Sequence, residues 1–402
     1  MNNYSLGKKN IFGLMTIVCM AAFFLSNISY LPYFTNSGMT QMLSYPGWAM
    51  VGVAILIYRQ YYLSSRDLKF VVILLAAVCV MATVQGLANK NYYSSLLTKC
   101  FLIAMFILLL GGMVARTGRT WGEENSLFVV YIISTTVLCV VVYFRYLIGQ
   151  DLSSPIYSYG SKNETAFLAA ASVIMLLWMK QKKETKLHTL VKCALLLFFS
   201  YIIACMRCRS MLVAIAVMFV FYLFQKNVSK GIKAFIILGF IALLIALRNP
   251  QFYDNFVNNI LFAQRDSNDI NDLSSGRVDQ IAYAWQMFKQ NILLGTGDTR
   301  TVDCFYVSAL MQYGLILGGV LVLLGVYPVI WGICNYRKIK TPACMIMIFC
   351  ALAFAIGGIF EENAPFGPGV RCYISWFLFG YLRVQQAHGY FGGMNHEENR
   401  TA

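Results

Sequence analysis

The sequence predicts an all-α, polytopic membrane protein that forms a single integral membrane domain over residues 1–402. Hydrophobic residues make up 59% of the chain and charged residues only 12%, whereas charged residues are about a quarter of a soluble domain. Apolar runs of bilayer-crossing length recur about 12 times. We expect transmembrane helices near residues 11–31, 39–58, 68–87, 95–115, 126–148, 163–179, 189–205, 209–225, 232–247, 304–332, 342–360 and 369–384.

The distribution of charge predicts that both termini are cytoplasmic. With the N-terminus inside, the cytoplasmic segments carry 20 of the 32 Lys and Arg residues, and the inner side nets +14 against +1 outside. This asymmetry satisfies the positive-inside rule for a multi-pass membrane protein. The net charge of +15 follows from this topology and from anionic lipid headgroups, so no nucleic acid partner is expected.

The twelve cysteines do not have the spacing of a metal site. Most fall inside predicted spans, where cysteine behaves as a small apolar residue. The CMRC segment at 205–208 has no second pair and no nearby histidine, so we expect neither a metal nor another cofactor. A disulfide near the outer face is left open for Cys205, Cys208, Cys304 and Cys372.

The large extracytoplasmic loop at 248–303 is the only outer segment long enough to hold structure of its own. Its seven aspartates lack the spacing of an EF-hand and indicate a solvated surface. From Val278 to Ile292 apolar residues recur at spacings of three and four, which predicts an amphipathic helix. Ser274 or Ser275 is the expected N-cap and Gly295 the chain reversal.

We expect this helix to lie in the membrane interface with Trp285 toward the lipid and Arg277 raised toward solvent. The following span begins at about residue 304, and the chain ends in a polar cytoplasmic tail at 385–402.

Arginines and carboxylates gather at the predicted outer ends of the spans. Arg207 and Arg209 lie in the short hairpin 204–210, on the side that is otherwise poor in positive charge. They would either pair with Glu164, Glu361 or Glu362, or bind phosphate oxygens through bidentate guanidinium contacts. The remaining candidate cations are Arg145, about one turn below the surface, and Arg371, at the start of the last span.

The order of these motifs resembles a known family. The hairpin MRCRS, the pattern SGR...W.......LGTG....VD..Y...L...GL..G and a closing pair of spans are similar to the O-antigen polymerase and O-antigen ligase superfamily. The similarity is strongest over about 276–319, with weaker support from 163–224 and from the topology.

The resemblance implies a GT-C-like membrane glycosyltransferase that acts at the outer leaflet on glycans carried by undecaprenyl pyrophosphate. The matching positions imply that Arg207, Arg209 and Arg277 bind the pyrophosphate. Ligases of this superfamily have a histidine where this chain has Asp303, and the three histidines here are predicted to be cytoplasmic. This difference favours a Wzy-type polymerase, although Cys304 replaces the Asn that often follows the Asp in that branch.

The sequence therefore predicts a metal-independent polymerase of surface polysaccharide repeat units, such as O-antigen. Arginines would stabilise the leaving pyrophosphate, and Asp303, Glu361 or Glu362 would serve as general base. The expected partners are undecaprenyl-pyrophosphate-linked oligosaccharides and the bilayer, and a chain-length regulator is left open. The alternatives are an O-antigen ligase and a polysaccharide transporter (flippase); the absence of an internal repeat and the single dominant outer loop disfavour a transporter. An acyltransferase is third, because it would need an outer histidine.

Overall fold

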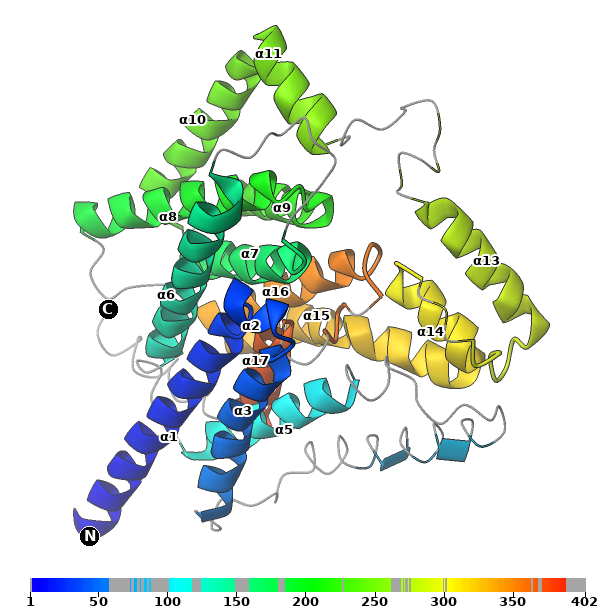
Figure 1. Ribbon diagram of the computed structural model, residues 1–402. Helices are drawn as coiled ribbons and strands as arrows, with labels where there is room; N and C mark the ends of the chain where they lie inside the picture. The colour runs from blue at the N-terminus through cyan, green and yellow to red at the C-terminus, as the bar shows by residue number, and fades with distance from the viewer. Residues whose placement is uncertain are drawn as a thin grey trace.

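The computed structural model describes residues 2–57, 101–117, 124–148, 159–179, 185–225, 228–261, 277–298, 302–362, 364–367 and 371–387, and single positions at 73–87, 269–276 and 300. All regular structure in these residues is helical (Figure 1), so the all-α fold class is confirmed. The elements are α1 (Asn2–Ile28), α2 (Pro32–Asn36), α3 (Thr40–Ile57), α5 (Leu102–Thr117), α6 (Glu124–Val142), η3 (Tyr143–Leu147), α7 (Lys162–Trp178), α8 (Lys186–Cys205), α9 (Arg209–Phe224), α10 (Lys230–Ala246), α11 (Pro250–Tyr253), η4 (Asp254–Leu261), α13 (Arg277–Gln290), α14 (Phe305–Tyr313), η5 (Gly314–Gly318), α15 (Gly319–Ile339), α16 (Pro342–Gly357) and α17 (Tyr373–Ala387).

Every predicted span coincides with helix except 68–87, which lies largely outside the described residues. By length and composition, three of the described helices could cross a membrane, or four if α10 and the bent segment after it form one span. Five further apolar helices are shorter than a full span. The count of twelve spans therefore stays a prediction.

The tightest helix crossing in the structure joins α5 to α17. A Cβ added at Gly111 would lie 2.1 Å from the carbonyl oxygen of Phe377, and one at Gly380 would lie 2.0 Å from that of Leu108. Only glycine permits this separation, because any side chain would overlap the facing backbone. The first and last parts of the chain are therefore packed into one body.

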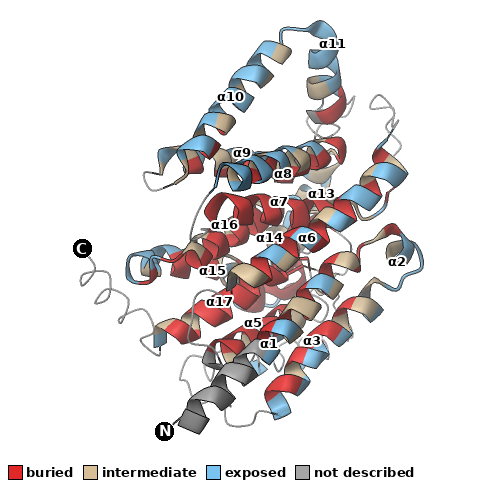
Figure 2. Cartoon of the chain, turned by 90° about the vertical axis from the view of Figure 1, so that its left-hand side faces the viewer, coloured by how far each residue is buried: buried red, intermediate tan, exposed pale blue. Residues whose placement is uncertain are grey.

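Helix α7 is the centre of the second half of the molecule. All its residues from Thr165 to Trp178 are buried, and it packs on α6, α8, α9 and α16. Figure 2 shows this burial as a continuous red core through α7, α16 and α17, while α10 is largely exposed at the periphery. Because α7 is enclosed on all sides, its N-terminus is held at a fixed position at one end of the bundle.

A tight helical hairpin follows the large loop. Residues Phe305–Ile339 are helical and apolar over 35 residues, about 52 Å if straight, which exceeds the roughly 30 Å hydrocarbon thickness. Gly314, with φ of 66°, interrupts the helix, and a Cβ added at Gly318 would meet the carbonyl oxygen of Ala309 at 2.4 Å. The start of the η5–α15 helix thus packs back against α14.

The predicted chain reversal at Gly295 caps both helices of this hairpin. The N–H groups of Thr296 and Gly297 donate to the last carbonyls of α14, at 2.9 and 3.1 Å. The N–H groups of Leu315 and Ile316 donate to carbonyls of residues 292 and 293, at 2.7 and 3.2 Å. Helix ends leave such groups unpaired, so the turn satisfies the C-terminus of α14 and the beginning of the helix that continues as α15.

The amphipathic helix exists as α13, but its environment differs from the expectation. Its N-cap residue is Gly276 (φ of 75°), while the Ser274 hydroxyl accepts from the Val278 N–H at 3.2 Å. Its buried residues, Ala284 and Phe288, face protein: Ala284 shares a small core with Val302, Cys304 and Met311. Arg277 is not raised toward solvent, because its side chain is only 22% exposed.

Two further expectations are settled by the described residues. None of the four cysteines for which a disulfide was left open forms one in the described residues: Cys205, Cys208, Cys304 and Cys372. Helix α17 continues to Ala387, so the first three residues of the predicted tail at 385–402 are helical, and the remainder lies outside the described residues.

Candidate functional site

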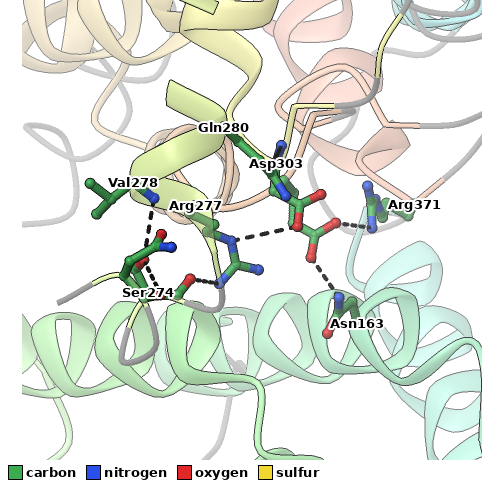
Figure 3. Close-up of polar contacts among 9 residues, drawn as sticks. Asn163, Ser274, Arg277, Val278, Gln280, Asp303 and Arg371 are labelled. Carbon is green, nitrogen blue, oxygen red and sulfur yellow. Dashed lines mark hydrogen bonds and ion pairs between the residues drawn. The ribbon is translucent and has the colours of Figure 1, made fainter. Parts of the chain in front are cut away.

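Six segments meet at the end of the bundle where α7 begins. They are the start of α7, the α8–α9 turn, the start of α13, the residues before α14, the loop after α16 and the residues before α17. Each segment contributes at least one charged side chain, and Figure 3 shows how Arg277, Asp303, Asn163 and Arg371 face a common region.

Arg277 and Asp303 form the most accessible ion pair of the group. The Nε of Arg277 lies 3.7 Å from Oδ2 of Asp303, and the two side chains are 22% and 41% exposed. That Nε is buried and has no hydrogen bond within the described residues, because 3.7 Å is beyond hydrogen-bond distance. The guanidinium also lies 6.0 Å from the ring centroid of Phe360. The Nε of Arg277 is therefore a donor that no described group accepts.

Asp303 is held in place through its backbone. Its N–H donates to Oε1 of Gln280, one turn along α13 from Arg277, at 2.8 Å. The flanking Val302 and Cys304 are buried in the small core beneath α13. The side chain of Asp303 consequently projects from a fixed backbone on the same side as Arg277.

Arg371 has a different environment from Arg277. Its side chain is 1% exposed, and Nη1 lies 3.6 Å from Glu164 and 3.8 Å from Glu361. Its guanidinium stacks over Phe167 at 4.8 Å. This permanently charged group links α7, the loop after α16 and the start of α17.

Glu361 occupies the centre of the charged group. Its Oε1 accepts from Nδ2 of Asn163 at 2.5 Å, and its Oε2 faces Arg371. Burial raises the pKa of Glu361, the charges of Glu164 and Asp303 add to the effect, and Arg371 and Arg277 oppose it. One oxygen of this carboxylate is thus hydrogen-bonded, and the other faces the guanidinium of Arg371 at 3.8 Å.

Glu362, the next residue, points to α14. Its Oε1 accepts from the Ser308 hydroxyl at 2.9 Å and from Nε2 of Gln312 at 3.2 Å. Burial raises the pKa of Glu362, the two hydrogen bonds lower it, and the charge of Asp303 raises it. Ser308 and Gln312 are one helical turn apart, so α14 presents both donors on one face.

Three further cations lie on the other side of Glu361. Burial lowers the pKa of Lys162, the first residue of α7, and the nearby charges of Arg207 and Arg209 lower it further, while Glu361 opposes them. Arg207 closes the α8–α9 turn with φ of 51°, a backbone conformation that is rare outside glycine and tends to occur at functional sites. The charges of the hairpin arginines and of Glu361 therefore both influence the pKa of the Lys162 ammonium group.

The structure brings most of the predicted site residues together. Arg277 pairs with Asp303, and Arg371 pairs with Glu361. The charge of Asp303 raises the pKa of Glu362. The charges of Arg207 and Arg209 lower the pKa of Lys162, which Glu361 raises. Arg145 has no contact that links it to this group in the described residues: it is exposed on η3, and its guanidinium lies 5.7 Å from the ring of Tyr146.

Sequence reasoning missed four polar partners in this group: Lys162, Asn163, Ser308 and Gln312. Ser308 and Gln312 could have been identified from the sequence, because they are two polar residues four positions apart in an apolar run, which places them on one face of a helix. Lys162 and Asn163 follow a glycine and begin a helix, but nothing in the sequence indicated that they face Glu361.

Comparison with known families supports the resemblance. Residues 194–316 match a family model described as O-Antigen ligase. The match runs from α8 to η5 and includes Arg207, Arg209, Arg277 and Asp303, while Lys162, Glu361, Glu362 and Arg371 lie outside it. It covers less than one third of the chain and confirms the similarity to the O-antigen polymerase and ligase superfamily. No curated protein matches the chain.

The arrangement suits anion binding combined with proton transfer. Guanidinium donors, which keep their charge at any physiological pH, surround carboxylates that differ in accessibility. The described residues contain no group of three or more metal-binding side chains.

Proposed function

We propose that the protein is a membrane glycosyltransferase that polymerises lipid-linked glycan repeat units at the outer leaflet of a bacterial plasma membrane. The observation that carries the proposal is the pairing of the partly exposed Arg277 with the accessible carboxylate of Asp303. The O-Antigen ligase family match over the same residues supports glycan transfer from a lipid carrier. The proposal includes a GT-C-like arrangement, about 12 spans and cytoplasmic termini, which agree with the helical architecture.

The donor would be a growing glycan on undecaprenyl diphosphate. Arg277, with Arg207 and Arg209, would hold the diphosphate through charge-assisted hydrogen bonds and stabilise it as it leaves. Both segments lie within the family match and near Glu361, which supports a shared anion site. The cations supply the charge that the leaving group needs without a metal ion.

The acceptor would be the next repeat unit on its own lipid diphosphate. Its sugar hydroxyl oxygen attacks the anomeric carbon of the donor, the bond from that carbon to the diphosphate oxygen breaks, and a carboxylate takes the hydroxyl proton. Asp303 is the best placed carboxylate, because it is 41% exposed and adjacent to Arg277. Glu362 is the alternative, whereas Glu361 accepts from Asn163 and lies against the buried Arg371.

Arg371 and Glu361 would serve the site as a framework. An arginine that is 1% exposed between two carboxylates and an aromatic ring is not open to substrate in this conformation. We propose that it orients Glu361, and through Asn163 the start of α7, next to the diphosphate site. This assignment gives Arg371 a positioning role instead of the substrate contact expected from the sequence.

A reconstitution with one substrate tests the proposal. The purified protein in liposomes receives only an undecaprenyl-diphosphate-linked repeat unit, and the products are resolved by size. A polymerase uses this molecule as both donor and acceptor, so a ladder of lipid-linked oligomers is expected. A ligase would leave the substrate unchanged until a different acceptor is added, and a flippase would move it across the bilayer without extending it.

The diphosphate role is tested in the same assay. Arg277→Ala is expected to reduce product by about a hundredfold or more, because it removes a charge-assisted contact to the leaving group. Arg300→Ala is the matched control, since Arg300 lies in the same loop with its side chain 70% exposed. Normal oligomer formation by a correctly inserted Arg277→Ala protein would reject the proposed anion site.

A further inference from the structure

Five large aliphatic side chains are exposed together where the Gly295 turn meets the α14–α15 hairpin. We call them the aliphatic tip: Ile292, Leu293, Leu294, Leu315 and Ile316. Each is between 46% and 59% exposed. Exposed apolar patches of this kind usually mark a surface that contacts a partner or a membrane.

The aliphatic tip is one rigid surface. The backbone hydrogen bonds from Leu315 to Ile292 and from Ile316 to Leu293 join its two segments side by side. Gly295 and Gly314 pack so closely that a Cβ on either would lie 2.4 Å from the backbone nitrogen of the other. The exposed side chains are therefore presented by a fixed backbone, and the turn cannot fold them inward without breaking these contacts.

The tip continues the outward-facing stripe of α15. Ile316, Leu323 and Ile330 are each seven residues apart, which places them on one face of the helix, and all three are exposed. Residues Phe305–Ile339 are apolar enough to cross a membrane, so this stripe faces lipid. Because Ile316 belongs both to the stripe and to the tip, the lipid-facing surface runs without interruption into residues 292–294.

The length of α15 places the tip at the outer boundary of the bilayer. From Gly314 to Ile339 the helix is about 39 Å long, against about 24 Å for its neighbour α16. Gly325 lies at the level of the outer end of α16. A Cβ added at Gly325 would contact Phe305 and Pro365. The N–H of Phe305 in turn donates to the carbonyl of Gly358, the residue that follows α16. The tip thus stands about 16 Å farther out than that level.

The residues that precede the tip are those found at a lipid headgroup boundary. Trp285 is 45% exposed on the penultimate turns of α13, and Lys289 is exposed in its last turn. Tryptophan and lysine beside aliphatic side chains are typical of segments that lie in a membrane interface. In Figure 1, α13 and α14 meet at this point, away from the core of the bundle.

We infer that the aliphatic tip inserts into the outer leaflet and anchors α13 to the membrane surface. The ligand is the bilayer itself: aliphatic side chains enter the acyl region, and Trp285 and Lys289 meet the headgroups. Helix α13 is then fixed at its C-terminal end by lipid and at its N-terminal end by the Arg277–Asp303 pair. The anchor is the turn after α13, not the helix face that the sequence indicated.

Collision of spin labels with paramagnetic reagents tests this inference without any activity measurement. Labels are attached to Leu293→Cys, Gln286→Cys and Leu323→Cys in the full-length protein in phospholipid nanodiscs, and the signal of the parent protein is subtracted. Gln286 is exposed on α13, and Leu323 lies in the lipid-facing stripe. We expect the ratio of oxygen to water-soluble nickel collisions at 293 to exceed that at 286 several-fold and to lie below that at 323, which is deeper in the bilayer.

Two results would overturn the inference. A label at 293 that meets the nickel reagent as often as the label at 286 places the tip in water. A label at 293 that is shielded from both reagents places the tip against protein, either a partner or a second copy. If Leu293→Cys does not accumulate, Leu294→Cys gives the same comparison, because both side chains point away from the protein.

Discussion

Two arginines of the site show how environment separates roles that the sequence could not distinguish. Arg277 is 22% exposed, whereas Arg371 is 1% exposed and enclosed by Glu164, Glu361 and Phe167. Removing a buried charge leaves its partners uncompensated. Substitution of Arg371 is thus expected to affect folding and site geometry together, while substitution of Arg277 affects the site alone.

Asp303→Asn is predicted to lower turnover strongly while the protein remains inserted and abundant. An amide cannot take the acceptor proton, and general-base catalysis contributes roughly a hundredfold to ten-thousandfold. The measurement is the initial rate of oligomer formation in liposomes at saturating substrate. The Gln280 contact is made to the backbone N–H, so this substitution leaves it intact. A near-normal rate for Asp303→Asn alongside an inactive Glu362→Gln would assign the base to Glu362.

Glu362 gives a prediction about stability and pH. Burial raises its pKa in the folded state above the ordinary value of about 4.3, so the folded protein holds this proton more tightly than the unfolded chain. This contribution to stability is complete below the unfolded pKa and is lost as the pH rises through the folded pKa. Glu362→Gln should therefore gain stability relative to the parent as the pH rises from the unfolded pKa of about 4.3 through the raised pKa of the folded state.

Thermal unfolding of both proteins in the same detergent measures this difference. The amide oxygen of Gln can still accept from Ser308 and Gln312, so the substitution keeps the two hydrogen bonds. A difference in melting temperature that does not change with pH would show that the carboxylate is not destabilised by its burial.

At the scale of elements, the Gly295 turn is the feature on which the site depends most. It caps the end of α14 and the start of the following helix, and it connects α13 to both. Two of its contacts require glycine, because Gly295 and Gly314 both have positive φ and face each other across a very short distance. Motif LGTG in the sequence is thus explained by backbone proximity rather than by a chemical role.

Gly295→Ala and Gly314→Ala are each predicted to lower the melting temperature and to reduce transfer. The added Cβ would lie 2.4 Å from facing backbone, and the backbone conformation is unfavourable for alanine. Gly38→Ala is the control, since Gly38 has φ of 70° but nothing within 4 Å of an added Cβ. If all three variants lose the same stability, the close approach contributes nothing and only the dihedral angle matters.

At the scale of the whole molecule, short helices surround one long hairpin. Helices α7, α9 and α16 have 16 or 17 residues, about 25 Å, which is less than the hydrocarbon thickness of roughly 30 Å. In the proposed orientation, the site at the ends of these helices lies within the membrane thickness on the extracytoplasmic side, beside the longer hairpin. Such a recess suits a diphosphate whose lipid tail remains in the bilayer.

The orientation is tested by reporter fusions. The excess of Lys and Arg on one side predicts that a fluorescent protein fused after residue 402 is bright, because it folds in the cytoplasm. Alkaline phosphatase inserted after Asn249, at the start of the large loop, should be active, since it requires the oxidising outer compartment. The reverse pattern would place the arginines of the site in the cytosol and exclude an outer-leaflet reaction.

The sequence alone determined the helical membrane architecture. The length and hydrophobicity of an apolar run decide whether that segment can cross the bilayer, and both can be measured on the sequence. It also indicated most of the charged residues, since arginines and carboxylates at the ends of apolar runs stand out. Only the tertiary structure decided which polar groups meet: Asn163 and Glu361 are 198 residues apart, and their contact depends on how α7 and α16 pack. The tertiary structure also decided the environment of α13, whose apolar face covers a small protein core. Apolar periodicity predicts that one face of a helix is buried, but it does not predict whether lipid or protein covers that face.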